Sequence, residues 1–199
     1  PFFFFTPTTA NEIRLSLVGS EMCIRDSDTS LDFVPINIAV ITISDSRTKE
    51  NDTSGDTLEK RITDAGHTMI KRTIIPDDVS QIKDTLDTMS KEEDIDCIIT
   101  TGGTGLTGRD TTPEAVNAIA SKHIDGFGEL FRQVSFEKIG TSAIQSRAVA
   151  ALINSTYVFC LPGSTGACKD GWDEILQYQL DIRHKPCNFV EIMPRLNEK

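Results

Sequence analysis

The feature that most constrains this chain is an alternation of short apolar runs with amphipathic stretches, which begins near residue 36. Runs rich in β-branched and aromatic residues predict buried strands at 36–43, 67–76, 95–101 and 156–162. Between them, apolar residues recur at three-to-four spacing, which is typical of helices packed on one face. Because short connections join each strand to a helix and then to the next strand, the pattern predicts a three-layer α/β/α sandwich with a mostly parallel sheet.

The helices between the strands have recognisable ends. Asp78 stands before an amphipathic run and predicts a capped helix start, and Pro113 occupies a favoured first-turn position. The stretch 127–138 is apolar on more than one face, which favours a contact between subunits. The expected helices cover residues 53–66, 77–93, 113–120, 127–138, 141–153 and 167–180.

The balance of charge limits the classes of ligand. Thirty acidic and twenty basic residues give a formal net charge of −10, which argues against a general nucleic-acid binder. A phosphate ligand would therefore depend on local donors or a metal ion. No apolar run approaches the length of about 18–20 residues that a membrane-spanning helix requires. The spacing of the five cysteines matches no zinc site. If these cysteines are free thiols, the reducing cytoplasm is the expected location of the protein.

The chain divides unevenly. Residues 1–27 follow no helix or strand period and include a stretch that resembles translated adapter sequence, so we expect a non-native leader there. Residues 28–34 are expected to be a linker, 35–190 one folded domain, and 191–199 a tail.

Polar loops follow the predicted strands. They are SDSR (44–47), PDD (76–78), TGGTGLTGRD (101–110) and PGST (162–165). In a parallel sheet, ligands gather at the carboxyl ends of the strands near the point where the strand order reverses. The coincidence of these loops at one sheet edge predicts a binding site without reference to any family.

The glycine loop satisfies two familiar fingerprints only in part. Gly103, Gly105 and Gly108 fit GxGxxG, but further residues separate them from the following helix. Read as a P-loop, the same stretch has Arg109 for lysine and Asp110 for the hydroxyl that binds Mg²⁺. The glycines alone leave a phosphate loop and a plain turn equally open.

The acidic residues at this edge have two readings each. Asp110 beside a loop of backbone N–H groups either shares a Mg²⁺ ion with a bound phosphate or caps the next helix. Asp77 either points at the site or belongs with Asp78 to a helix cap. Arg109 either meets a phosphate or pairs with nearby acids. Together these residues favour a Mg²⁺-nucleotide site.

Taken together, SDSR, DTSG, IIPDD, TTGGTGLTGRDTTPEA, GFGELFRQVSFEKIGTSAIQSRAVA and LPGSTGAC resemble the MoaB/MogA family of molybdenum cofactor biosynthesis proteins, which includes the G domain of gephyrin. The resemblance covers about residues 35–190 and is closest to the B-type members in its second half. It implies a molybdopterin-binding, Rossmann-like α/β/α fold. It also implies the adenylylation of molybdopterin by Mg-ATP, which yields molybdopterin-AMP and pyrophosphate.

The resemblance also implies roles for single residues. Asp77 and Asp110 match the catalytic aspartates and would bind Mg²⁺. Residues that would bind the nucleotide are Ser44, Gly102, Gly103, Thr104 and Gly105. Residues that would bind molybdopterin are Ser142, Ser146, Arg147, Gly163 and Ser164, the last less securely because PGST replaces the PGxP of other branches.

Alternatives from other classes stay open. Some B-type members lack the aspartate that corresponds to Asp77 and are thought not to adenylylate, whereas this chain retains it. A non-catalytic molybdopterin-binding or scaffold protein is the first alternative, and a dinucleotide-binding oxidoreductase, resting on GxGxxG alone, is the second. The family further implies a homotrimer or a dimer of trimers and a downstream molybdate insertase as partner.

Overall fold

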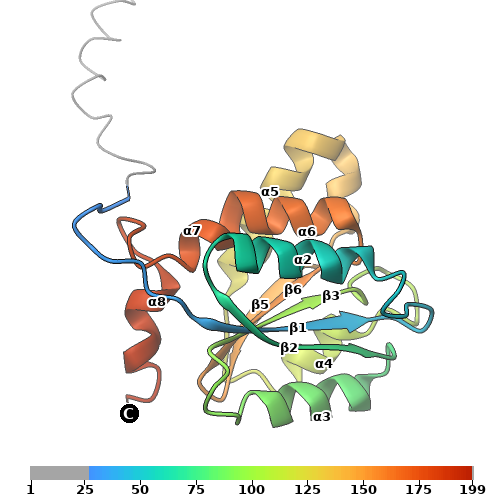
Figure 1. Ribbon diagram of the computed structural model, residues 1–199. Helices are drawn as coiled ribbons and strands as arrows, with labels where there is room; N and C mark the ends of the chain where they lie inside the picture. The colour runs from blue at the N-terminus through green and yellow to red at the C-terminus, as the bar shows by residue number, and fades with distance from the viewer. Residues whose placement is uncertain (1–26, 199) are drawn as a thin grey trace, which may run out of the picture.

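The computed structural model describes residues 27–198, so the interpretation of residues 1–27 as a leader falls almost entirely outside the described residues. The described part contains one sheet with the strand order β2-β1-β3-β6-β5-β4 (Figure 1). Pairing is parallel among β2, β1, β3 and β6, and antiparallel at β5. The strands are β1 (Asn37–Ile43), β2 (Thr68–Ile75), β3 (Cys97–Thr101), β4 (Lys122–His123), β5 (Val149–Ile153) and β6 (Thr156–Leu161).

Helices cover both faces of the sheet, as the alternation predicts. In Figure 1, α2, α5 and α6 lie on one face, and α3 and α4 lie on the other. The helical segments are α2 (Thr53–Asp64), α3 (Val79–Met89), α4 (Thr112–Asn117), α5 (Asp125–Ile139), the 3₁₀ segment η1 (Gly140–Gln145), α6 (Thr165–Gly171), the π segment η2 (Trp172–Leu176), α7 (Gln177–Gln179), α8 (Phe189–Ile192) and the 3₁₀ segment η3 (Met193–Arg195).

The central strands are buried on both faces. Ile38 and Val40 of β1 face the cluster that contains Leu58 of α2, whereas Ile41 faces the cluster that contains Leu86 of α3. This two-sided burial explains why the run is continuously apolar. The layered fold and the mostly parallel sheet are therefore confirmed. Among residues 27–198, no helix has the length and apolar character needed to cross a bilayer.

The expected helix over residues 141–153 is wrong. The structure has η1 there and then β5, which forms a hairpin with β6 through Asn154 and Ser155. Side chains of β5 alternate between the two cores, with Leu152 in one and Ile153 in the other, which is the period of a strand. Asn154 has φ 53°, a left-handed conformation that suits a tight hairpin turn.

The segment before α5 also differs from the expectation. The helix expected over 113–120 ends at Asn117, and the short strand β4, which contains His123, follows where no strand was expected. Two residues of the segment 28–34 contact the domain: the N–H of Asp28 donates to the carbonyl of Arg183 at 2.7 Å, and the ring of Phe33 contacts that of His67. Met193 and Leu196, in the segment expected to be a tail, pack against the core that α2 covers.

Candidate functional site

The order of the strands creates a crevice at one edge of the sheet. From β1 the chain passes outward to β2 and then crosses back to β3 on the other side of β1. The loops that leave β1 and β3 therefore diverge at their carboxyl ends. In open α/β sheets this switch point is where ligands bind.

A cavity of about 760 Å³ occupies this position. Its volume lies within the range of about 300–1,000 Å³ that is typical of small-molecule sites. All the polar loops that the sequence singles out contribute to it. The lining residues are 42–47, Ser54, Asp77, 101–105, Arg109, Asp110, Phe131, Ser135, Ile139, Ser142, Ala143, Gln145, Ser146, 162–164, Gly166, Ala167 and Asp170.

The glycine loop owes its path to two consecutive glycines. Gly102 has φ 111° and Gly103 has φ 64°, conformations that side chains rarely adopt. A Cβ on Gly102 would lie 2.1 Å from the carbonyl oxygen of Ile43, and one on Gly103 would lie 2.2 Å from Oγ1 of Thr112. The absence of side chains therefore lets the loop pack directly on the end of β1 and on Thr112 at the start of α4.

Asp110 is fixed by its own loop. Its Oδ2 accepts hydrogen bonds from Oγ1 of Thr107 at 2.6 Å and from the N–H of Thr107 at 2.9 Å. The hydroxyl of Thr107 is the main cause that lowers the pKa of Asp110, and backbone N–H groups and the charge of Arg147 add to it. Thr111, not Asp110, is the N-cap residue of α4. The helix-cap reading of Asp110 is therefore wrong, and the carboxylate lines the cavity.

Asp77 reaches the same cavity from the end of β2. Its Oδ1 accepts hydrogen bonds from Oγ1 of Thr111 at 2.7 Å and from the N–H of Thr111 at 3.0 Å. The neighbouring Asp78 instead caps α3 by accepting from the N–H of Gln81 at 2.9 Å. The two adjacent aspartates thus separate into one that lines the site and one that starts a helix.

Asp45 is a further carboxylate of the cavity that the sequence did not single out. Its Oδ1 accepts a hydrogen bond from the N–H of Asp77 at 3.2 Å, and its Oδ2 pairs with the guanidinium of Arg109. The structure thus shows the acid-pairing alternative for Arg109. The only available signal for Asp45 was its place in the SDSR loop after β1.

The residues matched to molybdopterin binding divide into two groups. Ser142, Ser146, Gly163 and Ser164 line the same cavity as the glycine loop. Arg147 is not among the lining residues; it donates to the carbonyls of Gly105 at 2.6 Å and of Asp110 at 2.7 Å and pairs with Glu114. Arg147 therefore stabilises the glycine loop without lining the cavity itself.

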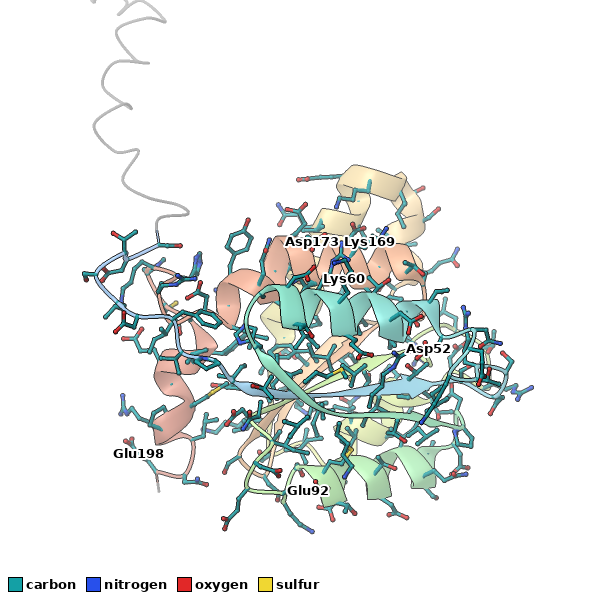
Figure 2. The ribbon with its side chains drawn as sticks, viewed as in Figure 1. Asp52, Lys60, Glu92, Lys169, Asp173 and Glu198 are labelled. Carbon is teal, nitrogen blue, oxygen red and sulfur yellow. The ribbon has the colours of Figure 1, made fainter. Side chains whose placement is uncertain are left out.

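Another residue that sequence reasoning missed is Asp52 of DTSG, which is completely buried. Its carboxylate accepts hydrogen bonds from Thr42 at 2.7 Å and Ser54 at 3.1 Å, and both of these residues line the cavity. Burial alone would raise the pKa of Asp52, but Arg72 and the other donors outweigh it and lower the pKa. Figure 2 shows Asp52 at the start of α2, near the carboxyl end of β1.

The donor set of the cavity fits a magnesium ion held jointly with a ligand. Mg²⁺ is usually bound by one or two carboxylates together with substrate phosphates and water, and Asp77 and Asp110 line one cavity. Within residues 27–198, no group of three histidine, cysteine or acidic side chains is arranged to hold a metal ion without such help. The residues therefore fit Mg²⁺ that arrives with phosphate and do not form a complete protein cage.

A switch-point cavity with a glycine loop and two fixed carboxylates is typical of α/β proteins that bind small ligands. The comparisons with known proteins narrow this class. Residues 39–182 match the family described as "Probable molybdopterin binding domain", and the chain belongs to that family. The membership confirms the resemblance that the sequence motifs carry.

Curated relatives agree with this assignment. The chain is 43% identical over 163 residues to Molybdenum cofactor biosynthesis protein B of Escherichia coli (strain K12), covering 82% of this chain and 96% of that protein. It is 42% identical over 146 residues to the protein of the same name from Bacillus anthracis, covering 73% and 86%.

Solved structures share the fold. A crystal structure of Molybdenum cofactor biosynthesis protein B has a TM-score of 0.76 at 36% identity and covers 85% of this chain and 100% of that one. The tungsten cofactor synthesizing protein MoaB from Pyrococcus furiosus has a TM-score of 0.68 at 30% identity and covers 82% and 98%. Homologues thus support a role in molybdenum cofactor biosynthesis.

Proposed function

We propose that the chain adenylylates molybdopterin with Mg-ATP and releases pyrophosphate. The observation that carries the proposal is that Asp77 and Asp110, each fixed by a threonine, line the same cavity as the glycine loop. An oxygen of the terminal phosphate of molybdopterin forms a bond to the α-phosphorus of ATP. The bond from that phosphorus to the β-phosphate oxygen breaks, and pyrophosphate leaves with the electron pair.

The residues of the chain contribute mainly by positioning and charge, on which phosphate chemistry depends. Gly102, Gly103, Thr104 and Gly105, together with Ser44, would hold the nucleotide phosphates through N–H and hydroxyl groups. Ser142, Ser146 and Ser164 would orient the phosphate and ring of molybdopterin. Asp77 and Asp110 would hold Mg²⁺, which when bound neutralises phosphate charge in this acidic cavity.

The test is pyrophosphate release from ATP in the presence of molybdopterin and Mg²⁺. We expect the unaltered chain to require both. Asp110→Asn and Asp77→Asn should each lower turnover by about a hundredfold or more, because each removes a fixed charge at the reacting phosphates. Asp78→Asn is the matched control, since it keeps the helix cap outside the cavity. Full turnover in Asp110→Asn would overturn the proposal.

A second candidate is a non-catalytic molybdopterin-binding protein of the same pathway. It is favoured by the names of the two curated relatives described above, both of which are given as protein B, since some B-type members are thought not to adenylylate. It predicts that molybdopterin binds while ATP is not consumed. A downstream molybdate insertase would receive the product in the first case and the bound pterin in the second.

We also propose that the chain assembles into a homotrimer or a dimer of trimers through the outer side of α5 and η1. Phe136 and Ile139 of α5 and Ile144 of η1 are exposed, whereas Phe131 of the same helix is buried in the core. Large apolar side chains exposed to solvent favour a protein contact. Sedimentation of the unaltered chain and of the Phe136→Asp variant tests this assembly, with dissociation of the variant as the expected result.

We also propose a cytoplasmic location. It is supported by the free thiols of the structure, which suit a reducing compartment; they are Cys97, Cys160, Cys168 and Cys187.

A further inference from the structure

The ion pair between Asp45 and Arg109 joins the loops that form the mouth of the cavity. Asp45 follows β1 and Arg109 belongs to the glycine loop after β3. The same Asp45 carboxylate accepts the N–H of Asp77, which follows β2. The Asp45 side chain, in the loop after β1, therefore connects three loops that each contribute to the site.

The pair is open to solvent and is therefore easily exchanged. The side chain of Arg109 is 77% exposed and that of Asp45 is 35% exposed. Exposed ion pairs are worth little because water screens the charges and the side chains lose freedom. Arginine binds phosphate through parallel N–H donors, and such charge-assisted contacts are stronger than ordinary hydrogen bonds.

The cavity has few cationic side chains that are available to a phosphate. Asp45, Asp77, Asp110 and Asp170 line the cavity, against Arg47 and Arg109. The guanidinium of Arg47 donates to the carbonyl of Asn51 in its own loop. Arg109 carries no such backbone contact through its guanidinium among the described residues, and its partner is the Asp45 carboxylate.

We propose that Asp45 sets nucleotide affinity by competing with a ligand phosphate for Arg109. In the free chain Arg109 pairs with Asp45, and when a nucleotide binds, the guanidinium exchanges this carboxylate for a phosphate. Asp45 thus lowers the affinity for the nucleotide by occupying Arg109, and Arg109 contacts the phosphate once the nucleotide is bound. This inference rests on the proposed function to the extent that it takes the cavity to bind a nucleotide phosphate.

Calorimetric titration of the full chain with ATP, with Mg²⁺ and again with EDTA, tests the exchange. Arg109→Gln should weaken ATP binding by about tenfold, as expected for loss of a charge-assisted contact. Asp45→Asn should tighten binding by about two- to fivefold, the range of an exposed ion pair. The amide keeps an oxygen that can accept the N–H of Asp77, so the loop contact is preserved.

The decisive variant is the double substitution. If Asp45 acts by competing for Arg109, the gain from Asp45→Asn disappears in the Arg109→Gln background. Glu198→Gln and Arg195→Gln, which alter an exposed ion pair of the same kind outside the cavity, control for net charge. Weaker binding by Asp45→Asn in either condition, or a gain that persists without Arg109, would overturn the inference.

The outcomes separate this inference from the proposed function. A chain that binds ATP with the expected coupling and yet forms no pyrophosphate would refute adenylylation alone. A chain that releases pyrophosphate, but in which Asp45→Asn weakens ATP binding, would refute the competition alone.

Discussion

At the scale of single residues, the site depends on threonines that fix carboxylates. The position of Asp77 and Asp110 after strands allowed both to be predicted from the sequence. Their hydrogen bonds to Thr111 and Thr107 could not be, because they depend on the exact turn of the loop. Asp45 was missed for the same reason, since its partners lie 32 and 64 residues away.

Thr107→Val should shift the pH dependence of adenylylation. The hydroxyl of Thr107 lowers the pKa of Asp110, so its loss raises that pKa towards the ordinary value. In the proposed reaction the ionised carboxylate would be the active form, so activity should fall as the pH drops through its pKa. The acidic limb of a pH profile of kcat/KM should therefore move to higher pH in Thr107→Val and return in Thr107→Ser. An unmoved limb would show that the hydroxyl does not act on Asp110.

Arg147→Lys distinguishes a role of Arg147 in supporting the glycine loop from a role in binding molybdopterin directly. The lysine keeps the charge but has one nitrogen in place of the three from which Arg147 contacts Gly105, Asp110 and Glu114, so the glycine loop should loosen. We expect the affinities for ATP and for molybdopterin both to fall, ATP by about tenfold, as measured by calorimetry. A loss confined to molybdopterin would instead mark Arg147 as a direct pterin contact, as the resemblance implied.

At the scale of elements, the parallel strands and α2 and α3 were predictable because their apolar periods are unambiguous. The segment 148–153 was not, because alanine-rich runs suit a helix locally and only pairing with β6 makes a strand. The one residue of this region that indicates a hairpin turn is Asn154. Its left-handed conformation is one that asparagine and glycine adopt readily.

Asn154→Val tests this hairpin. A β-branched residue is strained at φ 53°, and the contact from Asn154 to Oγ of Ser90 at 2.8 Å is lost as well. We expect the free energy of unfolding in urea to fall by about 2 kcal/mol. Asn154→Gly loses the same contact without the strain, so it should fall less. Equal losses in the two variants would exclude backbone strain as the cause.

At the scale of the whole molecule, His67 connects the first described segment to the core. Its Nδ1 accepts the N–H of Ile36 at 3.3 Å, and its ring contacts those of Phe33 and Trp172. Burial lowers the pKa of His67, and the Asp181 carboxylate opposes this shift. As the pH falls, His67 therefore becomes protonated at a higher pH in the unfolded chain than in the folded one.

This linkage predicts that the chain loses stability in mild acid. The stability that the neutral ring contributes is present above about pH 6.5 and declines as the pH falls below that value. Urea unfolding at pH 7.5 and at pH 5.5 should show a larger decrease in the unaltered chain than in His67→Gln. A decrease of the same size in both would exclude His67 as its source.

The measurement that tests the central claim most directly follows the α-phosphate of ATP. The unaltered chain is incubated with Mg²⁺, molybdopterin and ATP labelled at the α-phosphorus. We predict that the label appears in molybdopterin-AMP, with one pyrophosphate released for each label transferred. Label that remains in ATP while molybdopterin is bound to the chain would contradict adenylylation and leave a protein that binds the pterin only.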